Sequence, residues 1–181
     1  IASGSQRGME FMVSHGIKGV IAGGTAPGGS AEKTAQRWRE TLVNAGQEAA
    51  IGEGLALGVQ IHMADSERKA IEQATPYFEE QLKVLAPLGM VKNLSKEQIE
   101  ATADPAKALL VGLPTLQDAV ADGTWICGPP DKIKQDIAGI IERFPKIERI
   151  SVGLGGLGIP PSVIRKDLEW FGKEVLPQFR E

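Results

Sequence analysis

The chain has little of the two residue types that most often bind metals or form cross-links. Its 181 residues include one cysteine, Cys127, and two histidines, His15 and His62. One cysteine excludes a disulfide within the chain and a cysteine-rich zinc site, and two histidines leave little material for a histidine metal cluster. The scarcity of cysteine is typical of a reducing compartment, so we expect a cytoplasmic protein without a metal site.

Long hydrophobic runs and an excess of charge of one sign are also missing. No apolar run approaches the ~18 residues of a membrane span, so we expect no transmembrane segment. Twenty Lys and Arg against 23 Asp and Glu give a formal net charge of −3, which offers no electrostatic reason to bind nucleic acid or an anionic membrane. The chain begins with Ile1 and no signal peptide follows, so we expect a segment cut from a longer protein or a protein that has lost its N-terminal part.

The chain is rich instead in glycine and proline, 22 and 11 residues, which punctuate an alternation of strands and helices. Pro76 is expected to kink or split the third helix. The alternation is typical of an α/β fold with parallel strands, and it leaves open a doubly wound sheet or half of a (β/α)8 barrel. Apolar runs and helical spacing predict strands at 18–22, 55–64, 124–127 and 147–154, and helices at 5–16, 30–46, 65–85, 130–144 and 162–176.

Residues 86–123 break this alternation, because they contain no apolar run that predicts a strand. Ser95 and Gln98 have the spacing of a capping box, and Pro105 and Pro114 are typical of the first turns of two further short helices. We expect one domain over residues 1–181, with residues 86–123 as a helical, lid-like insertion. The equally weighted alternative is a subdomain that only covers exposed core.

Residues Gly4 to Gln6 form the candidate binding site. Glycine lets a ligand come close to the backbone, and Ser5 stands where the first helix begins. The N–H groups and partial positive charge of a helix N-terminus, together with the Ser5 hydroxyl, suit a phosphate group. The alternative is that Ser5 only caps the helix.

The histidines and the cysteine are weaker candidates. His62 lies in the strand at 55–64, on the face opposite Ile61. There it either meets a ligand inside a barrel or, as is more common, is a hydrogen-bonded core residue. We interpret His15 as a structural residue in the last turn of its helix and Cys127 as a buried, inert thiol. No catalytic triad or pair of carboxylates emerges, so the catalytic residues stay unassigned.

Five segments, taken in order along the chain, carry a family resemblance. The most specific is the closing helix with its proline, Phe171-x-x-Glu174-Val175-Leu176-Pro177. The others are a serine turn with its helix, a helix that ends in Ala-Gly, a strand with the next helix start, and a glycine-proline turn: Ser3–Gly16, Trp38–Gly46, Val59–Ala70 and Ile126–Ile133. Together they resemble the C-terminal half of the bacterial luciferase-like flavin monooxygenase family.

This resemblance implies a fold, a cofactor and a site. The family folds as a TIM-type (β/α)8 barrel and binds FMN or, in a sister branch, a deazaflavin coenzyme. By position, Ser5 matches the serine that binds the flavin phosphate, Gly4 and Gln6 flank it, and the Gln6 backbone N–H would share the phosphate. The implied protein is the C-terminal part of a TIM-type barrel that uses reduced flavin and oxygen on a small organic substrate.

Two alternatives accompany this interpretation. One is a deazaflavin-dependent reductase or dehydrogenase of the same fold, and the other is a non-enzymatic, flavin-free partner subunit. The family's early strands, which supply part of the flavin pocket, are absent from the chain. Because half a barrel leaves strand edges unpaired, we expect a homo-oligomer or association with the missing N-terminal half.

Overall fold

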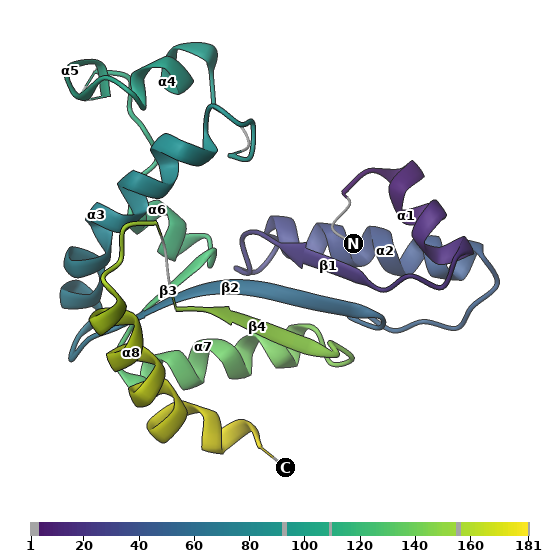
Figure 1. Cartoon of the computed structure of the whole chain (residues 1–181). Coiled ribbons are helices and arrows are strands. Elements are labelled where there is room, and N and C mark those ends of the chain that lie inside the picture. The colour runs from purple at the N-terminus through teal and green to yellow at the C-terminus, as the bar shows by residue number, and fades with distance from the viewer. Residues whose placement is uncertain (1–3, 92–93, 109, 155–156, 181) are drawn as a thin grey trace.

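The structure, a computed structural model, describes residues 4–91, 94–108, 110–154 and 157–180. Ser3, with which the serine turn of the family resemblance begins, lies outside these residues. One parallel sheet runs through the molecule, with helices around it (Figure 1). Its strands are β1 (Gly19–Ala22), β2 (Leu55–Met63), β3 (Trp125–Gly128) and β4 (Arg149–Gly153). The α-helices are α1 (Gln6–Ser14), α2 (Ser30–Asn44), α3 (Glu67–Leu85), α4 (Lys96–Ala101), α5 (Pro105–Ala108), α6 (Leu116–Ala121), α7 (Pro130–Arg143) and α8 (Pro161–Trp170).

Polar caps and glycines set the ends of these helices, as the sequence predicts. Ser66 Oγ accepts a hydrogen bond from the Lys69 N–H at the start of α3. Ser95 and Gln98 form both hydrogen bonds of the capping box at the start of α4. Gly16 follows α1 with φ of +63°, the left-handed conformation that commonly ends a helix. These predicted helix ends are confirmed.

Helix α3 passes through Pro76 as one helix of 19 residues, so the split expected there is wrong. Proline removes a backbone hydrogen bond and crowds the preceding turn. However, α3 buries Ala70 and Ala74 before Pro76 and Leu82 after it. Packing on both sides of the proline therefore keeps the two halves in one element.

The last predicted helix changes its form before it ends. α8 stops at Trp170, and the chain continues as a π-helix over Phe171–Val175 and a 3-10 helix over Leu176–Phe179. Phe171 and Val175 are both buried against the core. The final segment is therefore helical as predicted, but it is not a single α-helix.

β2 is the central strand, and the other three strands all pair with it in parallel. β1 pairs with residues 55–58 of β2, β3 with residues 60–63, and β4 with residues 56–60. A strand has two edges, and the residues of β2 that pair with β4 overlap those that pair with β1 and those that pair with β3. β1 and β3 therefore share one edge of β2, and β4 takes the other. Consecutive strands of a barrel would instead place β4 beside β3.

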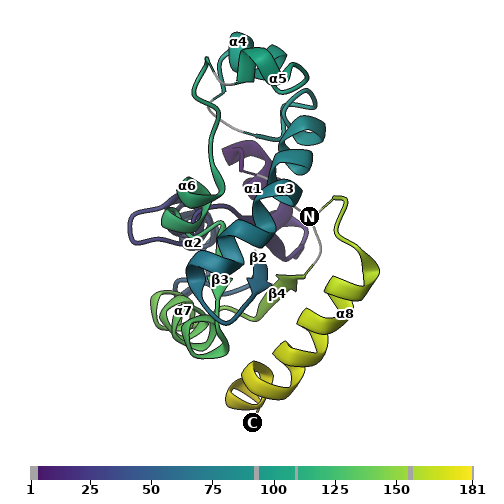
Figure 2. The ribbon, with the colours of Figure 1, turned by 90° about the vertical axis from the view of Figure 1, so that its left-hand side faces the viewer.

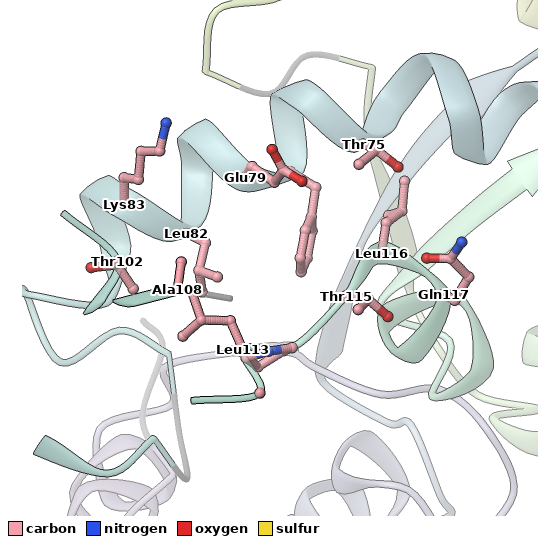
Figure 3. Close-up of a pocket in the computed structure, with 13 residues that line it drawn as sticks. Thr75, Glu79, Leu82, Lys83, Thr102, Ala108, Leu113, Thr115, Leu116 and Gln117 are labelled. Carbon is pink, nitrogen blue, oxygen red and sulfur yellow. The ribbon is translucent and has the colours of Figure 1, made fainter. Parts of the chain in front are cut away.

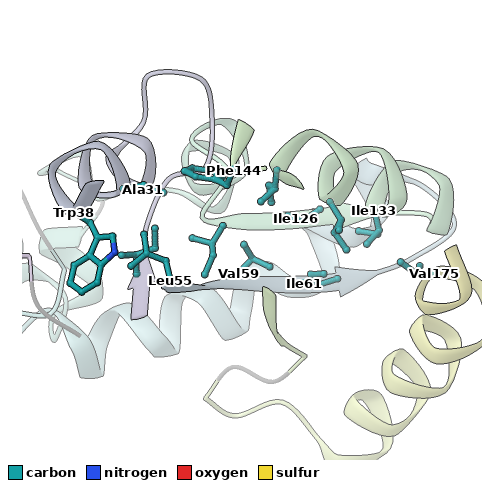
Figure 4. Packing of buried hydrophobic residues seen from close by; sticks show 14 of the residues in the cluster. Ala31, Trp38, Leu55, Val59, Ile61, Ile126, Ile133, Phe144 and Val175 are labelled. Carbon is teal, nitrogen blue, oxygen red and sulfur yellow. The ribbon is translucent and has the colours of Figure 1, made fainter. Parts of the chain in front are cut away.

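Alternate residues of the strands feed two hydrophobic clusters on opposite faces of the sheet. Leu55, Val59 and Ile61 of β2 pack with residues of α2 and α7 in the larger cluster (Figure 4). In β3, Ile126 joins this cluster, whereas its neighbour Trp125 packs against α3 and α6 in the second one. Helices therefore cover both faces of β3, as they do in an open, doubly wound sheet.

The arrangement confirms the expected fold class, α/β with parallel strands. In the side view, α7 lies to the left and α8 to the right of β4 (Figure 2). In a complete barrel the helices would form one outer ring. The partial TIM-type barrel therefore stays a prediction that concerns the complete protein.

The insertion at residues 86–123 contains no strand in the part that the structure describes, as expected. α4 and α5 lie beyond the end of α3, away from the sheet, and α6 returns to pack against α3 and β3 (Figure 1). Gly123, with φ of +78°, ends the segment, and its carbonyl accepts a hydrogen bond from Thr25 Oγ1 at 2.9 Å. The lid role of the insertion stays a prediction.

Candidate functional site

Ser5 caps α1 and is exposed at its N-terminus. Its backbone is extended, with φ of −88° and ψ of 145°, and its Oγ accepts a hydrogen bond from the Gly8 N–H at 3.2 Å. The backbone N–H groups of the first helical turn have no acceptor within the helix, and the helix dipole adds a partial positive charge at this end. The position can therefore attract an anion. The cap is observed, and the phosphate role of Ser5 stays a prediction.

Gly4 leaves the approach to this helix end open. A Cβ atom at Gly4 would meet no other atom within 4 Å. The Gly4 carbonyl oxygen accepts a hydrogen bond from Arg37 Nη1 at 2.9 Å, so a guanidinium group lies directly beside the predicted phosphate site. Arg37 belongs to the exposed face of α2. It is a functional candidate that sequence reasoning missed, because only the packing of α2 against α1 brings it to Gly4.

The side chain of Gln6 is occupied by hydrogen bonds within the protein, so its backbone is the part that suits the candidate site. Its Nε2 donates to Glu10 Oε1 at 3.0 Å on the same helix and to Thr41 Oγ1 at 3.3 Å on α2. These two hydrogen bonds direct the amide group toward the α1–α2 contact. The Gln6 backbone N–H, in the first turn of α1, is then the part of the residue that suits an anion, as the resemblance implies.

His62 lies at the carboxyl end of β2, buried between two helices. Its Nδ1 is 3.0 Å from Asp167 Oδ2 of α8, and both side chains are at most 3% exposed. The distance fits an ion pair, but the angle at Nδ1 does not meet hydrogen-bond geometry, so we treat the contact as electrostatic. Nε2 lies 3.4 Å from Gln73 Oε1 of α3. The core interpretation of His62 therefore fits this structure better than a ligand contact.

The other two sequence candidates have structural environments. His15 Nδ1 lies 2.8 Å from the Phe11 carbonyl oxygen, and its ring stacks on the Phe11 ring at 4.2 Å between centroids. Burial, together with the smaller effect of the Glu67 charge, raises the pKa of the Cys127 thiol to about 12. A thiol with this pKa stays protonated near neutral pH and is a poor nucleophile. Both side chains fit the structural roles that the sequence predicts.

Neither a metal site nor a membrane-spanning helix is found among the described residues. No group of three or more His, Cys, Asp or Glu side chains there is arranged to hold a metal ion. No helix in the described ranges combines the length and the apolar character that a bilayer span requires. The arrangement of Ser5 and Arg37 at the start of α1 is the candidate ligand site.

Comparison with known proteins identifies the fold but not a family. No family model matches the chain, and no curated protein matches it by sequence. Solved structures do match, and the chain spans about half the length of each of the following three. The monooxygenase RslO1 of Streptomyces bottropensis has a TM-score of 0.62 and 16% identity, over 99% of this chain and 47% of its own.

The other two matches are enzymes with different cofactors. The oxygenating constituent of 3,6-diketocamphane monooxygenase from Pseudomonas putida, solved in complex with FMN, gives a TM-score of 0.63 and 18% identity, over 98% of this chain and 47% of its own. The coenzyme F420-dependent tetrahydromethanopterin reductase of Methanopyrus kandleri gives a TM-score of 0.65 and 18% identity, over 99% of this chain and 50% of its own. At these identities the likeness is one of fold. The chain therefore shares an α/β fold with about half of each of these three enzymes.

Proposed function

We propose that the chain is the C-terminal part of a flavin-dependent oxidoreductase of the luciferase-like type, with reduced flavin and oxygen acting on a small organic substrate. The observation that carries this proposal is the Arg37 guanidinium beside Gly4, at the N-terminus of α1. This cation beside Gly4, a residue that the resemblance assigns to the flavin phosphate site, supports the proposal. The fold that the chain shares with an FMN-bound monooxygenase and an F420-dependent reductase supports the same class.

In this proposal the chain holds the cofactor by its phosphate. The Ser5 hydroxyl and the backbone N–H of Gln6 donate to phosphate oxygens, Arg37 neutralises part of the charge, and Gly4 leaves room for approach. FMN and the deazaflavin coenzyme both carry a phosphate, so these residues suit either one. When bound, the flavin supplies the redox chemistry. The part of this chain is to anchor it, to orient it and to keep water from the reacting ring.

A ligand pair tests the proposal directly. FMN and riboflavin differ by the phosphate alone, and a hydrogen bond to a charged oxygen contributes about 1.5–3 kcal/mol. Titration followed by flavin fluorescence should therefore show FMN binding at least about tenfold more tightly than riboflavin. A parallel titration with the deazaflavin coenzyme decides between the two cofactors. Absence of saturable binding by both cofactors would contradict the proposal.

Replacement of Arg37 by Met is expected to weaken FMN binding about three- to tenfold, because an exposed charge interaction contributes roughly 1 kcal/mol. Arg39→Met is the matched control on the same helix, since Arg39 Nε donates to the Ala49 carbonyl oxygen and not to Gly4. Fluorescence titration at two salt concentrations checks the result, because the contribution of Arg37 should shrink as salt rises. Equal loss in both variants would point to α2 stability instead.

We further propose that the sheet is completed by other strands in the complete protein. Among the described strands, β1, β3 and β4 each pair only with β2, so each has an edge available for pairing. Val20 on β1 is 45% exposed. These features support association with a missing N-terminal half or with a second copy.

The chain by itself is therefore expected to self-associate. Light scattering should give a mass of at least two chains, and Val20→Lys should shift the distribution toward monomer, because a charge on an edge strand opposes pairing. Val43→Lys, at a residue of α2 that is 48% exposed, is the control that adds the same charge away from the sheet. A monodisperse monomer in the unsubstituted chain would contradict the incomplete-sheet proposal.

A further inference from the structure

A cavity of about 570 Å³ lies between α3 and the insertion, of which α6 is a part, and neither the fold nor the proposed flavin site accounts for it (Figure 3). Its volume falls in the range of small-molecule sites. α3 contributes Phe78 and Leu82 to the wall, and the segment before and into α6 contributes Leu113, Pro114 and Leu116. The walls are therefore largely apolar.

The hydroxyl groups around the cavity already use their protons within the protein. Thr75 Oγ1 donates to the Ile71 carbonyl oxygen at 2.8 Å, and Thr102 Oγ1 donates to the Ile99 carbonyl oxygen at 2.7 Å. Thr115 Oγ1 makes a 2.7 Å hydrogen bond to a carboxylate oxygen of α6. A hydroxyl that donates in this way still offers lone pairs. These hydroxyls can therefore accept a hydrogen bond from a ligand but not donate one.

Two charged residues of α3, Glu79 and Lys83, line the cavity. The Glu79 carboxylate repels an anion and can accept a hydrogen bond from a ligand, and Lys83 is held by its neighbour Glu80. Lys83 Nζ lies 2.5 Å from Glu80 Oε1, and the hydrogen bond to Glu80 raises the pKa of Lys83. An ammonium group that is already paired with a carboxylate attracts an anionic ligand only weakly. The charges near the cavity therefore do not favour an anion.

The wall that the insertion provides is fixed before any ligand arrives. Gln98 Nε2 of α4 donates to the carbonyl oxygens of Val111 and Gly112, at 3.3 and 3.0 Å. These bonds tie the segment that precedes α6 to α4. A site whose walls are already in place loses less ordering entropy on binding than one that must form around its ligand.

We infer that this cavity is a binding site for a neutral, mainly hydrocarbon molecule of drug-like size that carries one hydrogen-bond donor. Apolar walls suit the hydrocarbon body, and the threonine oxygens suit the donor. Occupancy would hold the insertion against α3. The inference does not depend on the proposed flavin site, because none of the cavity residues belongs to α1 or α2.

The probe that fits this description is N-phenyl-1-naphthylamine, a neutral aromatic fluorophore with one N–H group. Fluorescence titration should show saturable binding with one molecule per chain. Leu113→Asp, which puts a charge in the wall, should weaken binding about ten- to a hundredfold. Leu110→Asp is the matched control, because Leu110 lies in the same insertion, is 83% exposed and does not line the cavity. Lys83→Met should leave the affinity unchanged.

Hydrogen exchange on the unsubstituted chain gives a second test that needs no variant. The probe should slow exchange of the amides of residues 112–117 and leave α7 unaffected. Saturable binding, selective loss in Leu113→Asp and this local protection support the site. Absence of saturable binding, equal weakening by Leu110→Asp, or absence of protection at residues 112–117 would each overturn it. A large loss in Lys83→Met would overturn the neutral class of ligand.

Discussion

At a pH low enough to protonate the imidazole, replacing either member of the His62–Asp167 pair by leucine is expected to lower the free energy of unfolding by about 3–5 kcal/mol, because a buried ion pair that loses one partner leaves a charge without compensation. Asp167 would be left with the Met63 N–H, 3.4 Å from its Oδ2. Urea unfolding of His62→Leu and Asp167→Leu, followed by far-ultraviolet circular dichroism, measures the loss.

The double variant separates the interaction between His62 and Asp167 from the effect of replacing each residue alone. Two leucines of similar volume leave no buried charge, and such replacements are often neutral or stabilising. His62→Leu/Asp167→Leu should therefore lose less stability than either single variant. Losses that simply add would show that the two side chains are not coupled.

An exposed pair in the same region provides the comparison for burial. Lys69 Nζ lies 2.6 Å from Asp65 Oδ2 at the start of α3, and both side chains are exposed. Solvent screens such a pair, so Asp65→Ala should cause no measurable loss of stability. A loss in Asp65→Ala as large as that in Asp167→Leu would mean that burial is not the cause.

The pair also has a positional consequence. His62 and Asp167 join the carboxyl end of β2 to α8, which the chain reaches only after β4. If the pair sets where α8 docks, the single variants should also raise hydrogen exchange in α8 and in the π-helix that follows it, and leave α2 unchanged. The loss of stability would then be accompanied by faster hydrogen exchange that is confined to α8 and the π-helix.

The sequence predicts the local elements of this fold well, because local physics determines them. Apolar spacing gives the helix faces, and capping residues such as Ser66 and Ser95 give the helix starts. The split expected at Pro76 is the informative failure, since the local cost of the proline is outweighed by burial of Ala74 and Leu82 on either side. Contacts along one helix are visible in the sequence, whereas the packing that overrides them is not.

Strand pairing was beyond the sequence for the same reason. β4 pairs with β2 through residues 56–60, but nothing in the residues 149–153 distinguishes β2 from β3 as a partner. Parallel pairing is a long-range choice that depends on how helices such as α7 fill the two faces. The alternation of elements therefore fixed the α/β class and left the order of the strands open.

The candidate site divides in a similar way. Ser5 could be found, because a serine before a helix is a local signal. Arg37 could not be found, because it contacts Gly4 from 33 positions along the chain. Its sequence neighbours on α2 indicate only a polar helix face. Asp167 was missed likewise, as the partner of His62 lies on an element with no sequence link to β2.

Replacement of Ser5 by alanine is expected to weaken flavin binding by about one to two powers of ten, because a hydrogen bond to a charged phosphate oxygen contributes roughly 1.5–3 kcal/mol. The same change removes the cap that accepts from the Gly8 N–H, which should cost about 1 kcal/mol of stability. Affinity is therefore measured in the complete protein, well below its melting temperature, by titration with FMN and with the deazaflavin coenzyme.

Ser66→Ala separates the two roles of Ser5, because Ser66 caps α3 in the same way, with its Oγ accepting from the Lys69 N–H at 3.3 Å. Both variants should lose about 1 kcal/mol of stability from the missing cap. Only Ser5→Ala should lose flavin affinity, and the loss should disappear with riboflavin, which has no phosphate. If folded Ser5→Ala and Ser66→Ala proteins bind FMN and the deazaflavin coenzyme as the unsubstituted protein does, Ser5 is a helix cap and the phosphate assignment is wrong.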